Sequence, residues 1–168
     1  MGYVHDTAMS IDTPLQNVIA TVGTWTMVVA SNLWTYNHTA AANISILKVP
    51  LVLPKNSVAG KGAKLVSVDI WWSNATADLT DNSAILYKAT LPIQAGTLAA
   101  AVVTTTYDSG HDTAAKRYTQ AQHKMTLTVT TPAWVDDDEE YFIEITNNAA
   151  ASSVVKLQAI RANYTLRV

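Results

Sequence analysis

The clearest pattern in the chain is an alternation of hydrophobic and polar residues on both sides of an acidic connection. Residues 125–129 read Met-Thr-Leu-Thr-Val, and residues 141–145 read Tyr-Phe-Ile-Glu-Ile. A period of two is typical of a strand with one buried face. Between these segments, Pro132 interrupts strand pairing and the five acidic residues 136–140 are expected to stay in water. The pattern predicts two strands of an all-β domain.

Similar runs recur along most of the chain. Further strands are expected at 24–36, 43–53, 65–72, 84–91 and 153–168, with a segment at 97–107 that fits either a strand or one helical turn. In 65–72 we expect the even-numbered residues Val66 to Trp72 to share one face. In 84–91 we expect Ile85, Tyr87, Ala89 and Leu91 to face inwards. The hydrophobic phase changes within the last run, which predicts a bulge near residues 160–161.

These runs give eight or nine strands without a long helix or an internal repeat. The spacing predicts an antiparallel β-sandwich of the jelly-roll type over residues 24–168. Residues 1–23 lack a clear period and are expected to form an N-terminal arm that packs on a neighbour or wraps its own domain. A short helix is expected around residues 113–119.

Composition narrows the possible partners. Only 14% of the residues are charged, the net charge is −2, and there is no cysteine. We therefore expect no nucleic-acid partner, no disulfide and no thiolate metal site. The N-terminus lacks the features of a secretory signal, and the longest apolar run, residues 44–53, is too short to cross a bilayer. We expect no membrane partner and synthesis in a cytoplasm.

Two acidic segments are the candidate metal sites. Asp108, His111 and Asp112 lie close together in a polar loop, and Asp136 and Asp138 belong to the acidic connection. Imidazole and carboxylate groups bind divalent metals, but neither spacing matches a zinc or EF-hand pattern. The alternative is that these side chains stabilise turns or stay solvated. We expect no cofactor.

Catalytic patterns are absent from the sequence. Asp69 and Glu144 are the only acids within the expected strands, and each lies on the polar face of its strand. Neither a GxSxG sequence nor a P-loop is present. The sequence therefore favours a protein that is not an enzyme.

Aromatic side chains are the remaining candidates for binding. The chain has five tryptophans and seven tyrosines. Trp71 and Trp72 are adjacent in one strand, so they must point to opposite faces. Together with Trp25 and Trp34, they are candidates for a subunit interface or for stacking on sugar rings. A covered second sheet face is the further alternative.

A family resemblance rests on the block from Tyr107 to Thr146. Its YDSGH loop, HKMTLT strand and TPAWVDDDEEY turn resemble those of uncharacterised β-rich proteins found in phage and environmental genomes. The segment KVPLVLPKNSVAGKGAKL resembles them more loosely. The resemblance carries no catalytic residue, and it implies a virion structural role, such as capsid decoration or a tail component.

Two functions are therefore expected at this point. The first is a non-enzymatic structural protein that self-assembles into a homo-oligomer, for example a trimer, within a virion and beside other virion proteins. A weakly charged, cysteine-free β domain with apolar faces suits such an assembly. The alternative is a carbohydrate-binding β-sandwich module that uses exposed Trp and Tyr side chains.

Overall fold

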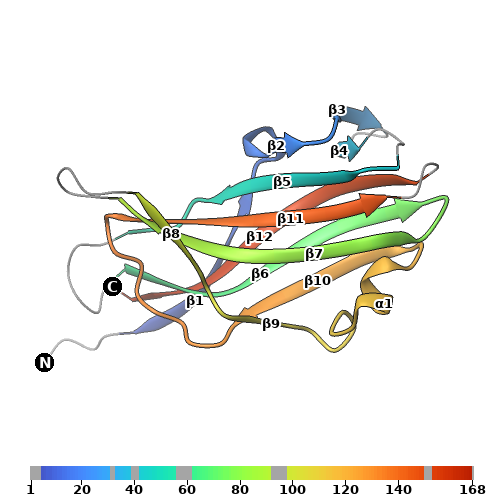
Figure 1. Ribbon diagram of the computed structural model, residues 1–168. Coiled ribbons are helices and arrows are strands. Elements are labelled where there is room, and N and C mark those ends of the chain that lie inside the picture. Colours follow the sequence, from blue (N-terminus) through green and yellow to red (C-terminus); the bar gives the residue numbers. More distant parts are fainter. Residues whose placement is uncertain are drawn as a thin grey trace, which may run out of the picture.

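The chain folds into two antiparallel β-sheets packed face to face (Figure 1). The computed structural model describes residues 5–30, 33–38, 42–55, 62–91, 98–149 and 153–167. Seven strands form one sheet, here called sheet A, and five form the other, sheet B. The predicted all-β sandwich is confirmed. No helix among the described residues has the length and hydrophobicity that a membrane crossing requires.

Eight strands form the jelly roll. They are β4 (Leu33–His38), β5 (Ile44–Leu51), β6 (Gly62–Ala75), β7 (Leu79–Thr90), β8 (Ala99–Val102), β10 (Gln122–Val129), β11 (Glu139–Ala149) and β12 (Val154–Arg167). Across sheet A these strands lie in the order β4-β12-β6-β10, and across sheet B they lie in the order β5-β11-β7-β8. The chain crosses repeatedly between the sheets, as in the double Greek key of a jelly roll.

Four further strands extend the two sheets. They are β1 (Asp6–Thr13), β2 (Ile19–Val22), β3 (Trp25–Ala30) and β9 (Thr105–Tyr107). The described strands number twelve rather than eight or nine, because the N-terminal region adds two and the ambiguous segment 97–107 contains both β8 and β9. The other elements among the described residues are a 3₁₀ turn, Leu15–Asn17, and the helix α1 (Ala114–Tyr118), which lies within the predicted helical segment.

The described part of the segment expected as an arm pairs with strands of the same chain. Strand β1 pairs with β12 in an unbroken register from Asp6–Arg167 to Thr13–Ile160, and β2 pairs with β5. Strand β4 pairs with β12 further along, at Lys156 and Leu157. Strands β1 and β4 therefore follow one another along the same edge of β12.

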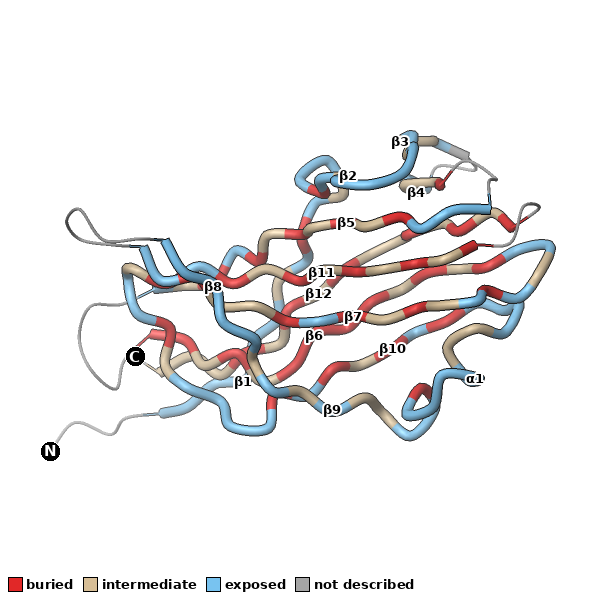
Figure 2. The backbone as a smooth tube through the Cα atoms, viewed as in Figure 1, coloured by how far each residue is buried: buried red, intermediate tan, exposed pale blue. Residues whose placement is uncertain are grey.

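The core lies between the sheets, and buried positions alternate along the long strands (Figure 2). The predicted inward positions in residues 125–129 and 141–145 are confirmed, since all six are buried. The predicted phase of residues 84–91 is wrong. Leu86 is buried opposite Ile143, whereas Ile85 and Tyr87 lie on the outer face, where Tyr87 stacks on Phe142 at 5.1 Å.

The last strand is irregular near the predicted bulge, with one register shift on each side of residues 160–161. The register of β12 against β6 shifts between Leu157 and Ala159, and again between Asn163 and Tyr164. Leu157 and Ile160 consequently both reach the core. The second shift also explains why Val66 is only half-buried, unlike the other even-numbered positions predicted with it.

The acidic connection is not wholly solvated, contrary to expectation. Glu139 is 7% exposed and forms an ion pair with Lys88 of the neighbouring strand β7. Its second oxygen accepts a hydrogen bond from the backbone N–H of Asp136 at 3.3 Å. Glu139 therefore closes the turn that precedes β11, while Asp136, Asp137 and Glu140 remain exposed.

Candidate functional site

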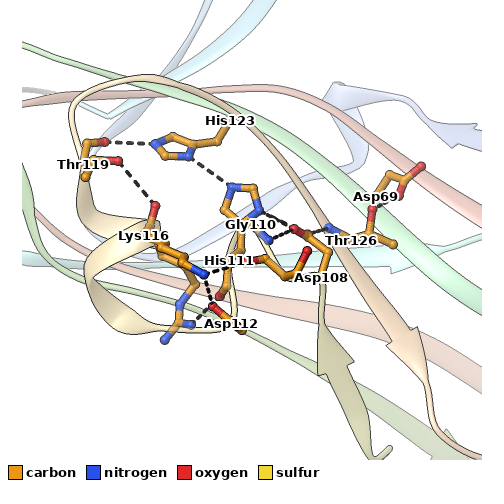
Figure 3. Close-up of polar contacts among 11 residues, drawn as sticks. Asp69, Asp108, Gly110, His111, Asp112, Lys116, Thr119, His123 and Thr126 are labelled. Carbon is orange, nitrogen blue, oxygen red and sulfur yellow. Dashed lines mark hydrogen bonds and ion pairs between the residues drawn. The ribbon is translucent and has the colours of Figure 1, made fainter.

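A chain of polar contacts joins the loop before α1 to strand β10 (Figure 3). His111 Nδ1 lies 3.0 Å from Asp108 Oδ1, and His111 Nε2 lies 3.2 Å from His123 Nδ1. His123 Nε2 in turn lies 2.9 Å from the carbonyl oxygen of Thr119. The two histidines thus connect both ends of residues 108–119, here called the α1 loop, to strand β10 of sheet A.

These contacts of Asp108, His111 and His123, here called the latch, hold the loop against the sheet and do not form an open site. His111 and His123 are only 8% and 7% exposed, and the His123 ring stacks on the core residue Trp72 at 4.6 Å. Arg117 Nη1 donates to the carbonyl oxygen of His111 at 2.8 Å. Because the imidazoles are covered on several sides, a substrate has no direct access to them.

Asp108 anchors the latch as a carboxylate. Partial burial raises the pKa of Asp108, but the hydrogen bond from the Thr126 N–H and the contact with His111 outweigh it and hold the pKa below its ordinary value of 3.8. A carboxyl group whose pKa is lower in the folded state than in the unfolded state stabilises the fold at pH values above the unfolded-state pKa. This stabilisation is lost as the pH falls through the lowered folded-state pKa.

We expect Asp108→Asn to lower the free energy of unfolding at neutral pH by about 1–2 kcal/mol, because charged hydrogen bonds become neutral ones. The difference from wild type should shrink as the pH falls below 3.8. Urea denaturation across this range checks both statements. Asp112→Asn is the control, because Asp112 pairs with Lys116 at the surface, and an equal effect there would contradict the assignment.

The candidate metal ligands do not converge. Asp108 and His111 are in contact, but Asp112 turns to Lys116 Nζ at 2.7 Å. Asp136 and Asp138 lie in the connection beyond the other end of β10. Among the described residues, no group of three or more His, Asp or Glu side chains is placed to hold a metal ion.

The two acids within the strands expected from the sequence, Asp69 and Glu144, are also separated. Asp69 lies in sheet A, where it pairs with Lys124 and accepts hydrogen bonds from Thr126 Oγ1 and Asn163 Nδ2. Glu144 lies in sheet B and pairs with Lys48 at 3.4 Å. Because the sheets pack face to face and both side chains point outwards, these carboxylates cannot flank one substrate bond.

The four candidate tryptophans have different environments. Trp72 is 3% exposed and belongs to the core, so it is not available as a surface contact. Trp25 is half-buried and stacks on Tyr36 at 5.5 Å. Trp34 is 62% exposed, and Trp71 is partly exposed on the outer face of sheet A.

Trp34 and Trp71 both line a groove on the outer face of sheet A. The groove has a volume of about 330 Å³ and is lined by Asp12, Leu33, Trp34, Thr35, Trp71, Gln122, Gln158, Ala159 and Arg161. It lies where β1 ends and β4 begins along β12, with β6 and β10 beside them. We call it the tryptophan groove.

The polar residues of the tryptophan groove form two pairs. Gln122 Nε2 donates to Gln158 Oε1 at 2.5 Å across the sheet. Arg161 holds Asp12 with two hydrogen bonds, from Nε at 2.6 Å and from Nη2 at 3.2 Å. Gln158 lies at the β12 bulge, and such irregularities re-aim side chains.

Cations flank the Trp71 ring. Lys124 Nζ lies 5.2 Å and Arg161 Cζ lies 5.4 Å from the centroid of the ring. The two cations come from β10 and β12, which lie on either side of β6. Such cation–π contacts stabilise the ring position by a small amount at an exposed site. Trp34 is the more open aromatic surface, and Trp71 lines the groove between the two cations.

The sequence identified the two tryptophans of this groove but not its polar residues. Gln122 and Gln158 are distant in the chain and carry no motif, and Asp12 belongs to the segment expected as an arm. The change of phase in the last strand was the one available signal, because the bulge it reveals presents Gln158 to the groove.

No protein-family model matches the chain, and no curated protein sequence matches it. Several solved structures are similar to it. A family two carbohydrate esterase from Cellvibrio japonicus has a TM-score of 0.48 and 7% identity over 98% of this chain, which spans 36% of that protein. The module TmCBM61, in complex with β-1,4-galactotriose, has a TM-score of 0.41 and 9% identity over 96% of this chain and 88% of its own. The low-affinity xylan-binding module CBM86 from Roseburia intestinalis has a TM-score of 0.40 and 11% identity over 94% and 96% of the two chains.

Proposed function

We propose that the protein is a non-catalytic carbohydrate-binding β-sandwich, and that the tryptophan groove holds a segment of a glycan chain. The observation that carries the proposal is the convergence of Trp34 and Trp71 with an amide pair in one surface groove. These residues come from β4, β6, β10 and β12, so the fold itself assembles the groove.

The aromatic side chains supply the apolar part of recognition. A pyranose ring has an apolar face of C–H groups and a rim of hydroxyls. Indole offers a large flat apolar surface with little conformational entropy to lose, because the side chain has only two rotatable bonds. Trp34 is 62% exposed, so its ring can receive such a face without a rearrangement of the core.

The polar residues supply the hydrogen bonds that give recognition its direction. A carboxamide both donates and accepts hydrogen bonds, which matches the dual character of a sugar hydroxyl. Gln122 and Gln158 hold each other at 2.5 Å and are therefore oriented before a ligand arrives. The volume of about 330 Å³ is at the lower end of the range for ligand sites, roughly 300–1,000 Å³, and suits a short segment of a chain.

We expect Trp34→Ala to weaken binding to soluble polysaccharides about tenfold or more, because truncation of an aromatic anchor typically costs about 2 kcal/mol. Affinity electrophoresis in gels that contain β-glucan, galactomannan, xyloglucan or arabinoxylan measures this loss. Thermal unfolding should remain close to wild type because Trp34 is exposed.

The matched control is Trp134→Ala. Trp134 is also partly exposed, but it lies beside Lys64 and Arg167, near the other end of β6. Binding that survives the Trp34 change, or that falls equally with Trp134→Ala, would contradict the proposal.

Self-assembly is a second candidate function, and one observation favours it. Large hydrophobic side chains are exposed on β2 and β3 and at the starts of β4 and β5, namely Ile19, Val22, Val29, Leu33 and Ile44. Burial of this surface by a second copy would remove it from water. Light scattering tests this candidate, and a monomer at micromolar concentration would contradict it. The virion role stays a prediction from the sequence.

A further inference from the structure

We infer that the tryptophan groove selects uncharged glycans over acidic ones, and that the Asp12–Arg161 ion pair enforces this choice. The inference rests on the proposed glycan binding and adds the class of ligand and the residue that determines it. It follows from how the charges around the groove are paired.

Each cation at the groove already has a carboxylate partner. Arg161 and Asp12 are direct cross-strand partners, and the guanidinium contacts both carboxylate oxygens. Lys124 Nζ lies 3.3 Å from Asp69 Oδ2. Asp69 is held in turn by Thr126 and Asn163, so its position is fixed. The groove therefore presents no unmatched positive charge from these two residues.

An acidic sugar would meet an unfavourable field here. Its carboxylate or sulfate would compete with Asp12 for Arg161, and Asp12 is exposed, with 61% of its side chain accessible. Like charges at close range repel, whereas hydroxyl groups can accept from the guanidinium or donate to the carboxylate without that cost. The intact ion pair is therefore compatible with hydroxyls and unfavourable for anions.

Selectivity then depends on the N-terminal strand. Asp12 lies near the end of β1, and the unbroken register of β1 against β12 places it opposite Arg161. A second pair of the same kind, Asp6 with Arg167, joins the opposite end of β1 to β12, away from the groove. The chain thus carries its own matched control for the charge pair.

The test replaces Asp12 by Asn and compares neutral with anionic probes. The neutral probes are β-glucan and galactomannan, and the anionic probe is polygalacturonate at low ionic strength. Wild type should bind a neutral probe at least about tenfold more tightly than polygalacturonate. Asp12→Asn leaves Arg161 without its carboxylate partner. The variant should therefore bind polygalacturonate at least about tenfold more tightly than wild type does, and added salt should abolish this gain in affinity.

Asp6→Asn is the control and should leave the preference unchanged. The inference is overturned if wild type binds polygalacturonate as tightly as the neutral probes, if Asp12→Asn gains nothing, or if Asp6→Asn gains as much. In these cases, glycan binding that still depends on Trp34 leaves the proposed function standing. Failure of wild type to bind any neutral or anionic probe would instead contradict the proposed function, and the inference with it.

Discussion

Trp72→Ala is expected to lower the free energy of unfolding by about 3–5 kcal/mol, the usual range for removal of a buried Trp side chain. Trp72 is 3% exposed and packs against both histidines of the latch, with ring centroids 4.6 Å from His123 and 5.5 Å from His111. Its loss leaves a cavity in the core and removes the surface on which the α1 loop is fixed. Denaturation in urea, followed by circular dichroism, measures the change.

The neighbouring residue provides the control. Trp71→Ala removes the same side chain from the outer face of the same strand, where its partners are Lys124 and Arg161. We expect a loss of only about 1 kcal/mol, because the ring is partly exposed and its cation–π contacts are weak in water. Equal losses for the two variants would show that the inner and outer faces have been assigned wrongly.

Gly23→Ala is expected to have the second largest effect on stability, roughly 2–4 kcal/mol. Gly23 joins β2 of sheet B to β3 of sheet A and has a φ of 84°, which is unfavourable for a residue with a side chain. An added Cβ would also lie 2.7 Å from the Cβ of Ser45 and 3.2 Å from His38 Nε2. The backbone would have to move to relieve both problems.

This change should also weaken glycan binding, because β3 pairs with β4, the strand that carries Trp34. Thermal unfolding and affinity electrophoresis measure the two effects in parallel. Thr24→Ala, at the exposed neighbouring position, should alter stability by less than about 0.5 kcal/mol. A Gly23→Ala protein as stable as Thr24→Ala would contradict the strain assigned to this joint.

The fold could be predicted where one face of a strand is polar. Residues 125–129 place Thr between Met, Leu and Val, so the phase of that strand is unambiguous. Residues 84–91 begin with four apolar or aromatic residues, Ala-Ile-Leu-Tyr, and contain few polar residues after them. Periodicity alone therefore could not show which side chains face the core. The pairing of Leu86 with Ile143 decides the phase, and that pairing depends on the tertiary structure.

The tryptophan groove was harder to predict for a related reason. Trp34 and Trp71 stand out by residue type, but Gln122, Gln158 and Arg161 become neighbours only through the order of strands in sheet A. Glu139 illustrates the same limit, since five consecutive acids look alike in sequence. Burial, the contact with Lys88 and the hydrogen bond from the Asp136 N–H together distinguish this residue from its exposed neighbours.

The most direct test of glycan binding in the tryptophan groove is an NMR titration of the indole N–H groups. The five tryptophans give five indole signals, which can be assigned by single substitutions. Neutral gluco-, galacto-, manno- and xylo-oligosaccharides are added in turn. We predict that at least one of them shifts the signals of Trp34 and Trp71 and leaves that of the buried Trp72 nearly unchanged. Shifts confined to Trp25 or Trp134, or no shift with any of the sugars, would contradict the account.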